Sequence, residues 1–319
     1  MAEKDIQGST VKKVATRESY GNALKELAEE FPELVVLDAD LATATKTSIF
    51  RKAYPDRHID CGIAEANMMG IAAGLSLTGR IPFVSSFAMF AAGRAFEQVR
   101  NSIGYPHLNV KIGATHAGIT VGEDGATHQC NEDIALMRTI PGMVVMCPAD
   151  DVEAKAAVRA ALEYQGPVYI RFGRAAVPVI NDHPGYRFEI GKGSVVREGS
   201  DVTIVATGIC VDSALGAAER LAADGINAEV ISICTIKPLD EEIIINSARK
   251  TGKVVTVEEH SVIGGLGSAV CDCLSASLPT GVKRLGMQDV FGESGSAAAL
   301  VQKYGLDAEG VYKSVKEFV

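Results

Sequence analysis

The sequence has 319 residues, of which 47% are hydrophobic and 22% are charged, and its formal net charge is −9. This composition is typical of a folded globular protein and excludes a disordered or fibrous chain. The acidic balance argues against a nucleic-acid-binding protein, because such binding relies on clustered lysines and arginines. A small anionic substrate is still compatible with the sequence, provided that a few local cations bind it.

The chain shows no sign of export or membrane insertion. Its amino-terminal segment, MAEKDIQGST, is polar and charged and lacks the apolar core of a signal peptide. No apolar run approaches the roughly 18 residues that a membrane-spanning helix needs. The seven cysteines are dispersed, which indicates reduced thiols rather than disulfides or a zinc site. We therefore expect a cytoplasmic protein that binds no membrane and has no metal site of its own.

Apolar, β-branched runs alternate with helical patterns along the first half of the chain. Predicted strands are 33–40, 81–87, 109–116, 142–150 and 167–174, and predicted helices are 62–79, 95–104 and 150–165. Around residues 176–192 the pattern breaks into a stretch rich in proline and glycine. The alternation then restarts, with strands at 201–208, 227–238 and 253–260 and helices at 211–225, 239–252 and 264–278.

This alternation indicates βαβ units, so we predict an α/β protein with two domains, residues 10–180 and 190–319, each a mainly parallel sheet flanked by helices. The glycines of GGLGSAV, residues 264–270, follow a strand and open a helix, as in a dinucleotide-binding loop. Because Val270 replaces the third glycine of that fingerprint, we interpret these glycines as a means of packing strand and helix closely.

In open parallel sheets, ligands bind at the carboxyl ends of the strands. The residues predicted at these ends of the first domain are Asp38, Asp40, Cys61, Glu65, Phe87, Phe90, His116, Arg171 and Arg174. The loop VGEDGATHQCNED, residues 121–133, follows directly and adds Asp124 and His128. Each residue alone has a simpler explanation, such as a helix cap, a core aromatic or a surface ion pair. Their position on one rim, rather than any single side chain, indicates a binding site.

A resemblance to the second half of transketolase is carried by GIAEANMMGIAAGL, SSFAMFAAGRAFEQVR, ATHAGITVGEDGATHQ and GPVYIRFGR, in this order. Residues 204–240 resemble the transketolase C-terminal domain, so the resemblance covers nearly the whole chain. It implies a thiamine-diphosphate pyrimidine-binding fold followed by a transketolase C-terminal-like fold. The implied reaction is the transfer of a two-carbon ketol unit from a ketose phosphate to an aldose phosphate, with thiamine diphosphate as cofactor.

The resemblance also implies which residues bind the cofactor. Glu65 matches the glutamate that hydrogen-bonds the aminopyrimidine ring at N1′ and favours the imino tautomer, whose 4′-nitrogen removes the proton from C2 of the thiazolium ring. Phe87 and Phe90 match the aromatic residues that flank the pyrimidine. Asp40 matches an aspartate that contacts the cofactor.

Other matched residues are implied to bind the substrate. His116 and His128 match histidines that contact substrate hydroxyl or carbonyl groups and assist proton transfer, and Asp124 matches an aspartate that binds a sugar hydroxyl. Arg17 and Arg174 match arginines that hold the sugar phosphate. Guanidinium groups suit this task, because they bind phosphate oxygens with two parallel hydrogen bonds.

Two single residues and one turn depart from the transketolase pattern. Gly93 stands where transketolases often carry another aromatic residue near the pyrimidine. The turn LATATKT, residues 41–47, replaces a Pro-Ser-Asn turn, so Thr43 or Thr45 is a candidate substitute for the serine that helps bind phosphate. Ala126 replaces a common proline. The first two departures affect the expected substrate contacts rather than the use of the cofactor.

The sequence lacks the GDG…N motif with which thiamine-diphosphate enzymes bind Mg²⁺ and diphosphate. The resemblance therefore implies a split transketolase, in which this chain is the C-terminal subunit and a separate N-terminal subunit supplies the Mg²⁺ and diphosphate site. We expect the isolated chain to be inactive and the assembly to contain two copies of each chain. The small residues of the predicted helix 62–79 allow close packing, either against another chain or within this one.

Four alternatives stay open. A deoxyxylulose-phosphate synthase-like half enzyme shares the glutamate and the loop but uses pyruvate as its donor. The beta subunit of the first component of pyruvate dehydrogenase shares the two-domain layout, although its usual loop differs. A non-catalytic subunit that keeps the fold is the third, and the intact set of Glu65, His116, Asp124 and His128 argues against it. A cysteine hydrolase using Cys130 and His128 would need a separately oriented base and an oxyanion hole.

Overall fold

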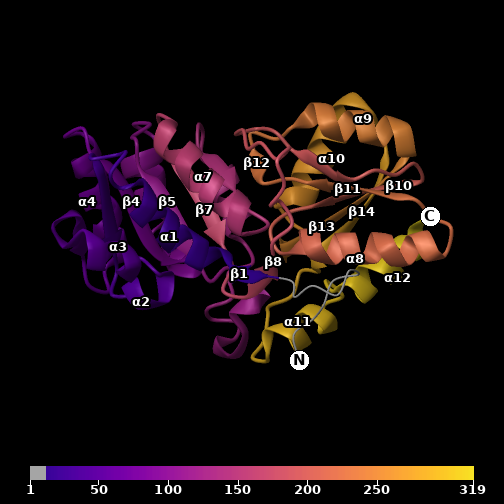
Figure 1. The fold of residues 1–319 in the computed structure, drawn as a ribbon, viewed down its shortest axis with the longest axis horizontal. Coiled ribbons are helices and arrows are strands. Elements are labelled where there is room, and N and C mark those ends of the chain that lie inside the picture. Colours follow the sequence, from indigo (N-terminus) through magenta and orange to yellow (C-terminus); the bar gives the residue numbers. More distant parts are fainter. Residues whose placement is uncertain (1–11) are drawn as a thin grey trace.

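The computed structural model describes residues 12–319. The expectation about a signal peptide, which rests on residues 1–10, and the predicted start of the first domain at residue 10 lie outside the described residues. The chain folds into two α/β domains that lie side by side, as Figure 1 shows, so the predicted fold class is confirmed. Within the described part of the chain, no helix is long and apolar enough to span a membrane.

The first domain is built on a seven-stranded sheet with the strand order β12-β6-β7-β5-β4-β2-β3. Its strands are β2 (Leu34–Asp38), β3 (His58–Asp60), β4 (Ile81–Phe87), β5 (Lys111–Thr115), β6 (Val144–Met146), β7 (Val168–Phe172) and β12 (Thr235–Lys237). β12 is antiparallel to β6, and the other neighbouring strands are parallel. The carboxyl ends of the parallel strands therefore meet at one edge of the sheet.

Alternate residues of the central strands face opposite layers of helices. Leu34 and Val36 pack in one hydrophobic cluster with α1 (Thr16–Leu27) and α7 (Asp151–Glu163). Val35 and Leu37 pack in another cluster with α4 (Glu65–Ser76). Both faces of β2 are thus buried, which explains why its sequence is an unbroken apolar run. The short helices α2 (Ala42–Thr45), α3 (Ser48–Ala53) and η1 (Pro55–Arg57) lead from β2 to β3.

An irregular helical layer follows β4, in place of the single helix predicted at 95–104. It begins with a π-helix, η2 (Met89–Arg94), and continues through α5 (Phe96–Gln98) and a second π-helix, η3 (Val99–Gly104). Ala91, Ala92 and Ala95 pack closely against the sheet. The prediction missed the first turns because these small residues carry no clear helical period. π-helical turns are rare and occur frequently at functional sites.

The second domain has a five-stranded sheet with the order β14-β13-β10-β11-β9. Its strands are β9 (Ser194–Arg197), β10 (Val202–Ala206), β11 (Ala228–Ser232), β13 (Lys253–Ser261) and β14 (Gly281–Met287). β9 is antiparallel to β11, and the other neighbours are parallel. One face is covered by α8 (Cys210–Ala223) and α12 (Ala308–Phe318), and the other by α9 (Glu241–Thr251) and α10 (Leu266–Ser277). A short pair, β1 (Lys13–Ala15) and β8 (Ala176–Pro178), completes the fold.

The prediction of a single strand at 227–238 is wrong, because this segment forms two strands. β11 lies in the second sheet, and β12 joins the first sheet beside β6. Between them Ile233 is buried, and the carbonyl of Cys234 accepts a hydrogen bond from the N–H of Cys147 at 2.8 Å. An apolar run gives no signal for the point at which a chain changes sheets, since both sheets bury it. β12 thus ties the two domains together.

The glycines of GGLGSAV pack strand against helix, as predicted. The carboxylate of Glu258 accepts hydrogen bonds from the N–H groups of Leu266 and Gly267 at 2.7 and 2.8 Å, and so fills the amino-terminal end of α10. A Cβ atom on Gly265 would lie 2.0 Å from that carboxylate. A dinucleotide phosphate has no room at this helix end, because a protein carboxylate already occupies the position that the phosphate would take.

Candidate active site

Glu65 lies at the amino-terminal end of α4, near the carboxyl edge of the first sheet. Its side chain is 2% exposed, so almost the whole carboxylate is removed from solvent. Both carboxylate oxygens accept a hydrogen bond from Nη1 of Arg94, each at 3.0 Å. A buried carboxylate needs such a partner, because an unpaired charge is costly to bury. Arg94 is a site residue that the sequence did not predict.

Four rings from three separate segments form one aromatic cluster beside Glu65. Phe87, at the end of β4, stacks on Phe90 with ring centroids 5.8 Å apart and on His116 at 3.9 Å. His128 turns its edge to Phe90 at 5.5 Å. The guanidinium carbon of Arg94 lies 4.5 Å from the centre of the Phe90 ring. The structure therefore brings together the predicted aromatic residues, both predicted histidines and, through Arg94, the predicted glutamate.

His116 directly follows β5 with a backbone φ of 56°, a left-handed conformation that is uncommon outside glycine and often marks a functional site. Arg17 can only donate, so Nε2 of His116 accepts its hydrogen bond at 3.0 Å, and Nδ1 is left to donate to the Thr115 hydroxyl at 2.9 Å. Burial, with the nearby charges of Arg17, Arg174 and His128, lowers the pKa of His116 to about 3. The imidazole is therefore neutral near neutral pH.

This shift predicts how acid affects stability. The pKa of His116 falls from 6.5 to about 3 on folding, so between these values the unfolded chain binds a proton that the folded chain excludes. Stability is therefore lost as the pH falls through this window, by about 1.4 kcal/mol per pH unit at most. Urea unfolding measures the free energy of unfolding at pH 7 and at pH 5. We expect this free energy to fall less between the two pH values in His116→Gln than in the wild type. Equal losses in the two proteins would contradict the neutral, buried state of His116.

Two arginines lie at the far side of the aromatic cluster. Arg17 donates to the carbonyl of Ala44 at 2.9 Å, and its pKa is lowered by burial and by the charge of Arg174. Its buried Nε has no hydrogen-bond partner among the described residues. Arg174 donates to the carbonyl of Val121 and pairs with Glu123 at 3.4 Å. Two neighbouring cations suit an anionic group, because a bound anion would relieve their mutual repulsion.

The remaining predicted residues lie at the edges of this arrangement. Asp124 is exposed on the loop between His116 and His128. Asp40 is exposed after β2, and its N–H donates to the carboxylate of Asp60 at 3.1 Å. It lines a hollow with Thr43 and Arg51, and no described contact joins it to the aromatic cluster. The structure therefore does not place Asp40 directly beside the other predicted cofactor residues.

In the turn LATATKT, the structure leaves only Thr43 as a candidate to replace the serine that helps bind phosphate. Thr45 is fully buried, and its hydroxyl donates to the Asp38 carboxylate at 3.0 Å, so it is not free to bind phosphate. Thr43 is exposed. Asp38 is correspondingly not a rim residue, because it is buried and also accepts hydrogen bonds from Thr47 and from the N–H of Leu41. It holds the turn in shape.

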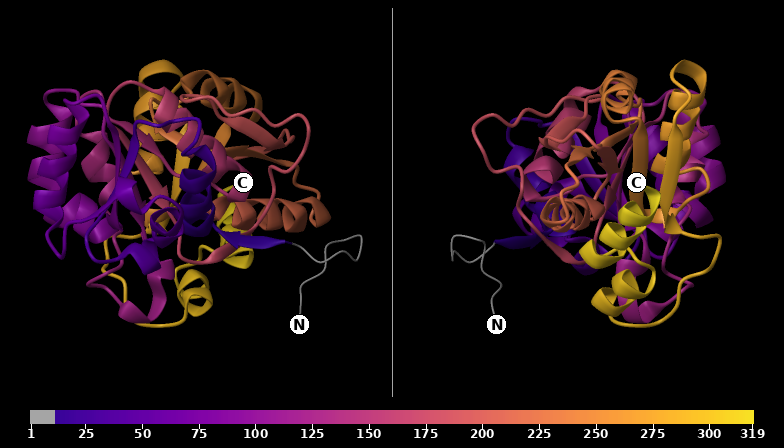
Figure 2. Two further views of the ribbon diagram at one scale, coloured as in Figure 1. Left: turned by 60° about the vertical axis from the view of Figure 1, so that its left-hand side comes forward. Right: turned by 90° about the vertical axis from the view of Figure 1, so that its right-hand side faces the viewer.

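Residues of the second domain hydrogen-bond to the loop 119–131 of the first domain. Oε1 of Glu259, at the end of β13, accepts a hydrogen bond from the N–H of Thr120 at 2.6 Å. Gln129 donates to the carbonyl of Glu293 at 2.8 Å. α11 (Ala297–Lys303) lies beside the 3₁₀ segment η4 (Ile119–Asp124), and Figures 1 and 2 show this return of the chain to the first domain. The position of the loop thus depends on residues far away in the sequence.

Arg171 helps to hold the loop 119–131 in position. This arginine was instead predicted to lie among the ligand-facing residues at the carboxyl ends of the strands. It is 5% exposed, and its Nε donates to the carboxylate of Asp133 at 3.0 and 3.2 Å. Its Nη2 donates to the carbonyls of Cys130 and Glu259, at 3.3 and 2.7 Å. The prediction failed because strand ends carry both ligand-facing and inward-facing side chains, and their direction depends on the partner available. Arg171 joins the loop to both domains.

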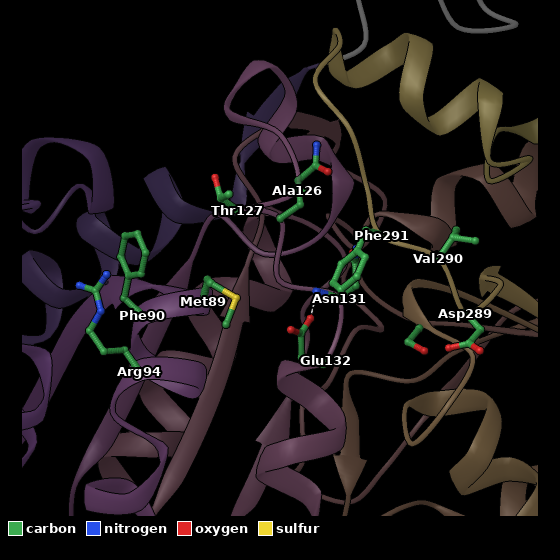
Figure 3. Close-up of a pocket in the computed structure, with 12 residues that line it drawn as sticks. Met89, Phe90, Arg94, Ala126, Thr127, Asn131, Glu132, Asp289, Val290 and Phe291 are labelled. Atoms are coloured by element: carbon green, nitrogen blue, oxygen red, sulfur yellow. Dashed lines mark hydrogen bonds between the residues drawn. The ribbon is translucent and has the colours of Figure 1, made fainter.

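A cavity of about 680 Å³ opens between the two domains next to the aromatic cluster (Figure 3). The second domain contributes Ser261 and residues 289–291 to its lining. The first domain contributes Met89, Phe90, Arg94, Ala126, Thr127, Gln129, Asn131 and Glu132. Val290 and Phe291 are exposed at its mouth, at 54% and 87%. The cavity gives a small molecule, or a segment of another chain, a way to approach Phe90 and Arg94.

The chemistry of these groups fits a flat heteroaromatic ring joined to an anionic substrate. Phe87 and Phe90 offer ring faces, Glu65 offers a buried carboxylate, and the histidines and arginines offer polar contacts further on. The described residues contain no group of three or more His, Cys, Asp or Glu side chains that could hold a metal ion. Cys130 is fully buried, and burial raises its pKa well above its usual value, which argues against a cysteine nucleophile.

The fold is that of the second half of a transketolase, a pyrimidine binding domain followed by a C-terminal domain. Residues 12–179 match the transketolase pyrimidine binding domain, and residues 191–311 match the transketolase C-terminal domain. The chain belongs to the transketolase family, as its sequence motifs indicated.

Relatives that are themselves parts of divided transketolases match along nearly their whole length. A putative transketolase C-terminal section of Methanocaldococcus jannaschii is 52% identical, over 94% of this chain and 95% of that protein. A 6-deoxy-6-sulfo-D-fructose transketolase subunit of Clostridium sp. strain MSTE9 is 47% identical, over 94% and 93%. A solved split gene transketolase in an inactive beta4 tetramer is 55% identical, with a TM-score of 0.88 over 96% of this chain and 98% of that chain.

Proposed function

We propose that this chain is the C-terminal subunit of a split transketolase. With thiamine diphosphate, it would transfer a two-carbon ketol unit from a ketose phosphate to an aldose phosphate, the reaction of EC 2.2.1.1 in the pentose phosphate pathway. The observation that carries the proposal is the unbroken series of contacts from Glu65 through Arg94 and the aromatic cluster to His116 and Arg17. It supplies a ring site at one end and an anion site at the other.

The cofactor would supply the thiazolium carbon that carries the two-carbon unit, and the residues of this chain position and polarise the reactants. Glu65 would hold a proton at the pyrimidine nitrogen, and Phe87 and Phe90 would fix the plane of the ring. Both ring nitrogens of neutral His116 are engaged, Nε2 by Arg17 and Nδ1 by the Thr115 hydroxyl, so His116 is proposed to contact a substrate hydroxyl or carbonyl through Nε2 once the substrate anion draws Arg17 away. His128, in the same aromatic cluster, is proposed to contact the substrate as well. Asp40 is proposed to contact the cofactor after assembly.

The substrate end favours a sugar with a terminal anion. Arg17 and Arg174 are proposed to hold it, because their guanidinium groups lie close enough for the charge of Arg174 to lower the pKa of Arg17. Exposed Asp124 can bind a sugar hydroxyl. A sulfonate is an alternative to phosphate, because a relative is a 6-deoxy-6-sulfo-D-fructose transketolase subunit. Both are tetrahedral oxyanions that a pair of guanidinium groups can bind.

An N-terminal subunit is proposed to bind Mg²⁺ and the diphosphate, in a cytoplasmic assembly with two copies of each chain. The exposed face of α4 is a surface for such contact. Gly70 and Gly74 are exposed, and a Cβ atom on either would meet nothing within 4 Å, so packing within this chain does not use them. Ile63 and Leu77, each 75% exposed, flank them. A close partner helix would cover this apolar strip.

Gly70→Leu is therefore expected to prevent assembly while leaving the fold of the isolated chain intact. The added side chain points into open space, and leucine favours a helix more than glycine by about 1 kcal/mol. Sedimentation of the mixed subunits would measure association, and circular dichroism would measure folding. Lys52→Leu, at an exposed position of α3, is the matched control and should assemble normally. Normal assembly of the Gly70→Leu chain would exclude this face as the contact.

The reaction itself is tested by mixing the purified chain with its N-terminal partner, thiamine diphosphate and Mg²⁺. We expect ketol transfer from xylulose 5-phosphate to ribose 5-phosphate by the mixture and none by this chain alone. The deoxyxylulose-phosphate synthase alternative predicts condensation of pyruvate with glyceraldehyde phosphate instead. If the mixture accepts neither donor although the chains associate, the non-catalytic interpretation gains support and the transketolase proposal fails.

A further inference from the structure

Arg94 occupies the place at which a heteroaromatic ring would meet both Glu65 and Phe90. Its Nη1 lies 3.0 Å from each oxygen of the Glu65 carboxylate, so the guanidinium faces that group head-on. Its central carbon lies 4.5 Å from the centre of the Phe90 ring. Figure 3 shows Arg94 and Phe90 next to each other beside the cavity between the domains.

A ring that stacked on this face of Phe90 and bonded to Glu65 would meet the guanidinium. Glu65 is only 2% exposed, so its carboxylate offers a ligand little surface beyond the part that Arg94 covers. A guanidinium and an aminopyrimidine are both planar groups with N–H donors, and both interact favourably with an aromatic face. The same two protein groups can therefore serve either one, but not both in this geometry.

Little else holds Arg94 in place. Within residues 12–319 its guanidinium makes no hydrogen bond except those to Glu65, and the side chain is 53% exposed. Its backbone ends the π-helix η2, directly after Gly93. Arg94 can consequently swing into solvent without breaking any other polar contact.

We propose that Arg94 is a positioning residue that holds the Glu65 carboxylate in the free chain and gives it up when the pyrimidine ring binds. This inference rests on the proposed function. Leaving a buried carboxylate without a partner is costly, so only a ligand that brings its own donor to Glu65 displaces the arginine. Arg94 thus selects rings that can hydrogen-bond the carboxylate and rejects apolar rings that merely fit on Phe90.

The alternative is that Arg94 forms a permanent wall of the ring site, in place of the aromatic residue that Gly93 lacks. The two interpretations predict opposite effects. If Arg94 competes with the ring, its removal strengthens ring binding. If Arg94 is a wall, its removal weakens binding.

The test uses the full-length chain and 4-amino-2-methylpyrimidine as the probe, with affinity measured by ligand-observed NMR in mild acid, where the ring is protonated. We expect Arg94→Ala to bind the probe about tenfold more tightly than the wild type, which corresponds to about 1.4 kcal/mol. Arg94→Lys should show a smaller gain, because lysine keeps the charge without the planar group. Arg100→Ala is the matched control. This arginine lies in η3 and donates to Asn101, away from Glu65, so its removal should change nothing.

Each outcome decides between the interpretations. Unchanged or weaker binding by Arg94→Ala, with circular dichroism confirming a folded chain, would overturn the role of Arg94 and leave the proposed function standing. Glu65→Gln should weaken probe binding whether or not Arg94 is present. Absence of binding by every chain would contradict the ring site itself, and both the proposed function and the role of Arg94 would then fall.

Discussion

Glu65→Gln is expected to reduce ketol transfer by the assembled two-chain enzyme by about 10²–10⁴-fold, the usual contribution of a positioned acid–base group. Glutamine has nearly the same shape as glutamate but cannot exchange a proton with the pyrimidine nitrogen. Because the carboxylate is buried at the start of α4, no water-exposed group can readily take its place. The rate should be measured at saturating donor and cofactor, so that weaker binding does not imitate slower chemistry.

Glu132→Gln is the matched control for this variant. Glu132 lines the same cavity, but its carboxylate accepts a hydrogen bond from the backbone N–H of Asn131, and within residues 12–319 no hydrogen bond or ion pair joins it to the four clustered rings. We expect it to retain activity within a few-fold of the wild type. Comparable activity of Glu65→Gln and the wild type, in assemblies of equal stability, would remove Glu65 from the mechanism.

Arg171→Met is expected to lower the free energy of unfolding by about 3–5 kcal/mol, the range seen when one partner of a buried ion pair is removed. Arg171 and Asp133 are 5% and 0% exposed, so the substitution strands a carboxylate in the interior. It also removes the hydrogen bond from Arg171 to the carbonyl of Glu259 and one of the two that the carbonyl of Cys130 accepts, the other coming from the N–H of Gly118. Urea unfolding at pH 7 measures the loss.

Two further variants show whether this loss has the stated cause. Arg159→Met removes an exposed arginine whose pair with Glu30 lies at the surface, and it should have little effect on stability. Adding Asp133→Leu to Arg171→Met removes the stranded charge and should recover part of the loss. A loss below about 1 kcal/mol for Arg171→Met would mean that the buried network does not hold the domains and the loop together.

This network gives the second domain a role in the site that the sequence did not reveal. The loop 119–131 carries Asp124 and His128, and it is fixed at Thr120 by Glu259 and at Gln129 by Glu293. These contacts join residues more than a hundred positions apart. Motion of the second domain would therefore change the position of the substrate-binding residues.

Sequence reasoning predicted those parts of the fold that depend on local pattern. The buried strands of the first sheet are apolar runs bounded by polar residues, and the rule that ligands bind at their carboxyl ends indicated where His116 and Phe87 lie. The crossing of β12 into the first sheet was missed, because its cause lies in the partner strand β6 and not in its own sequence.

The side-chain partners were harder to predict. Arg94 follows Phe90 by four positions, a spacing that places cation and ring on one helix face, and this was the signal that could have suggested their contact. Its bond to Glu65 spans 29 positions and has no local signature. Arg171 was assigned to the rim because the sequence does not state which way a side chain at a strand end points. Burial decides that question, and burial depends on both domains.

The most direct test of the central claim is a structure of this chain with its N-terminal partner, thiamine diphosphate and Mg²⁺. We predict that the Glu65 carboxylate lies within about 2.6–3.2 Å of a pyrimidine nitrogen, with the ring flanked by Phe87 and Phe90. A coenzyme bound elsewhere, or a Glu65 carboxylate turned away from its ring, would contradict the assignment of this site.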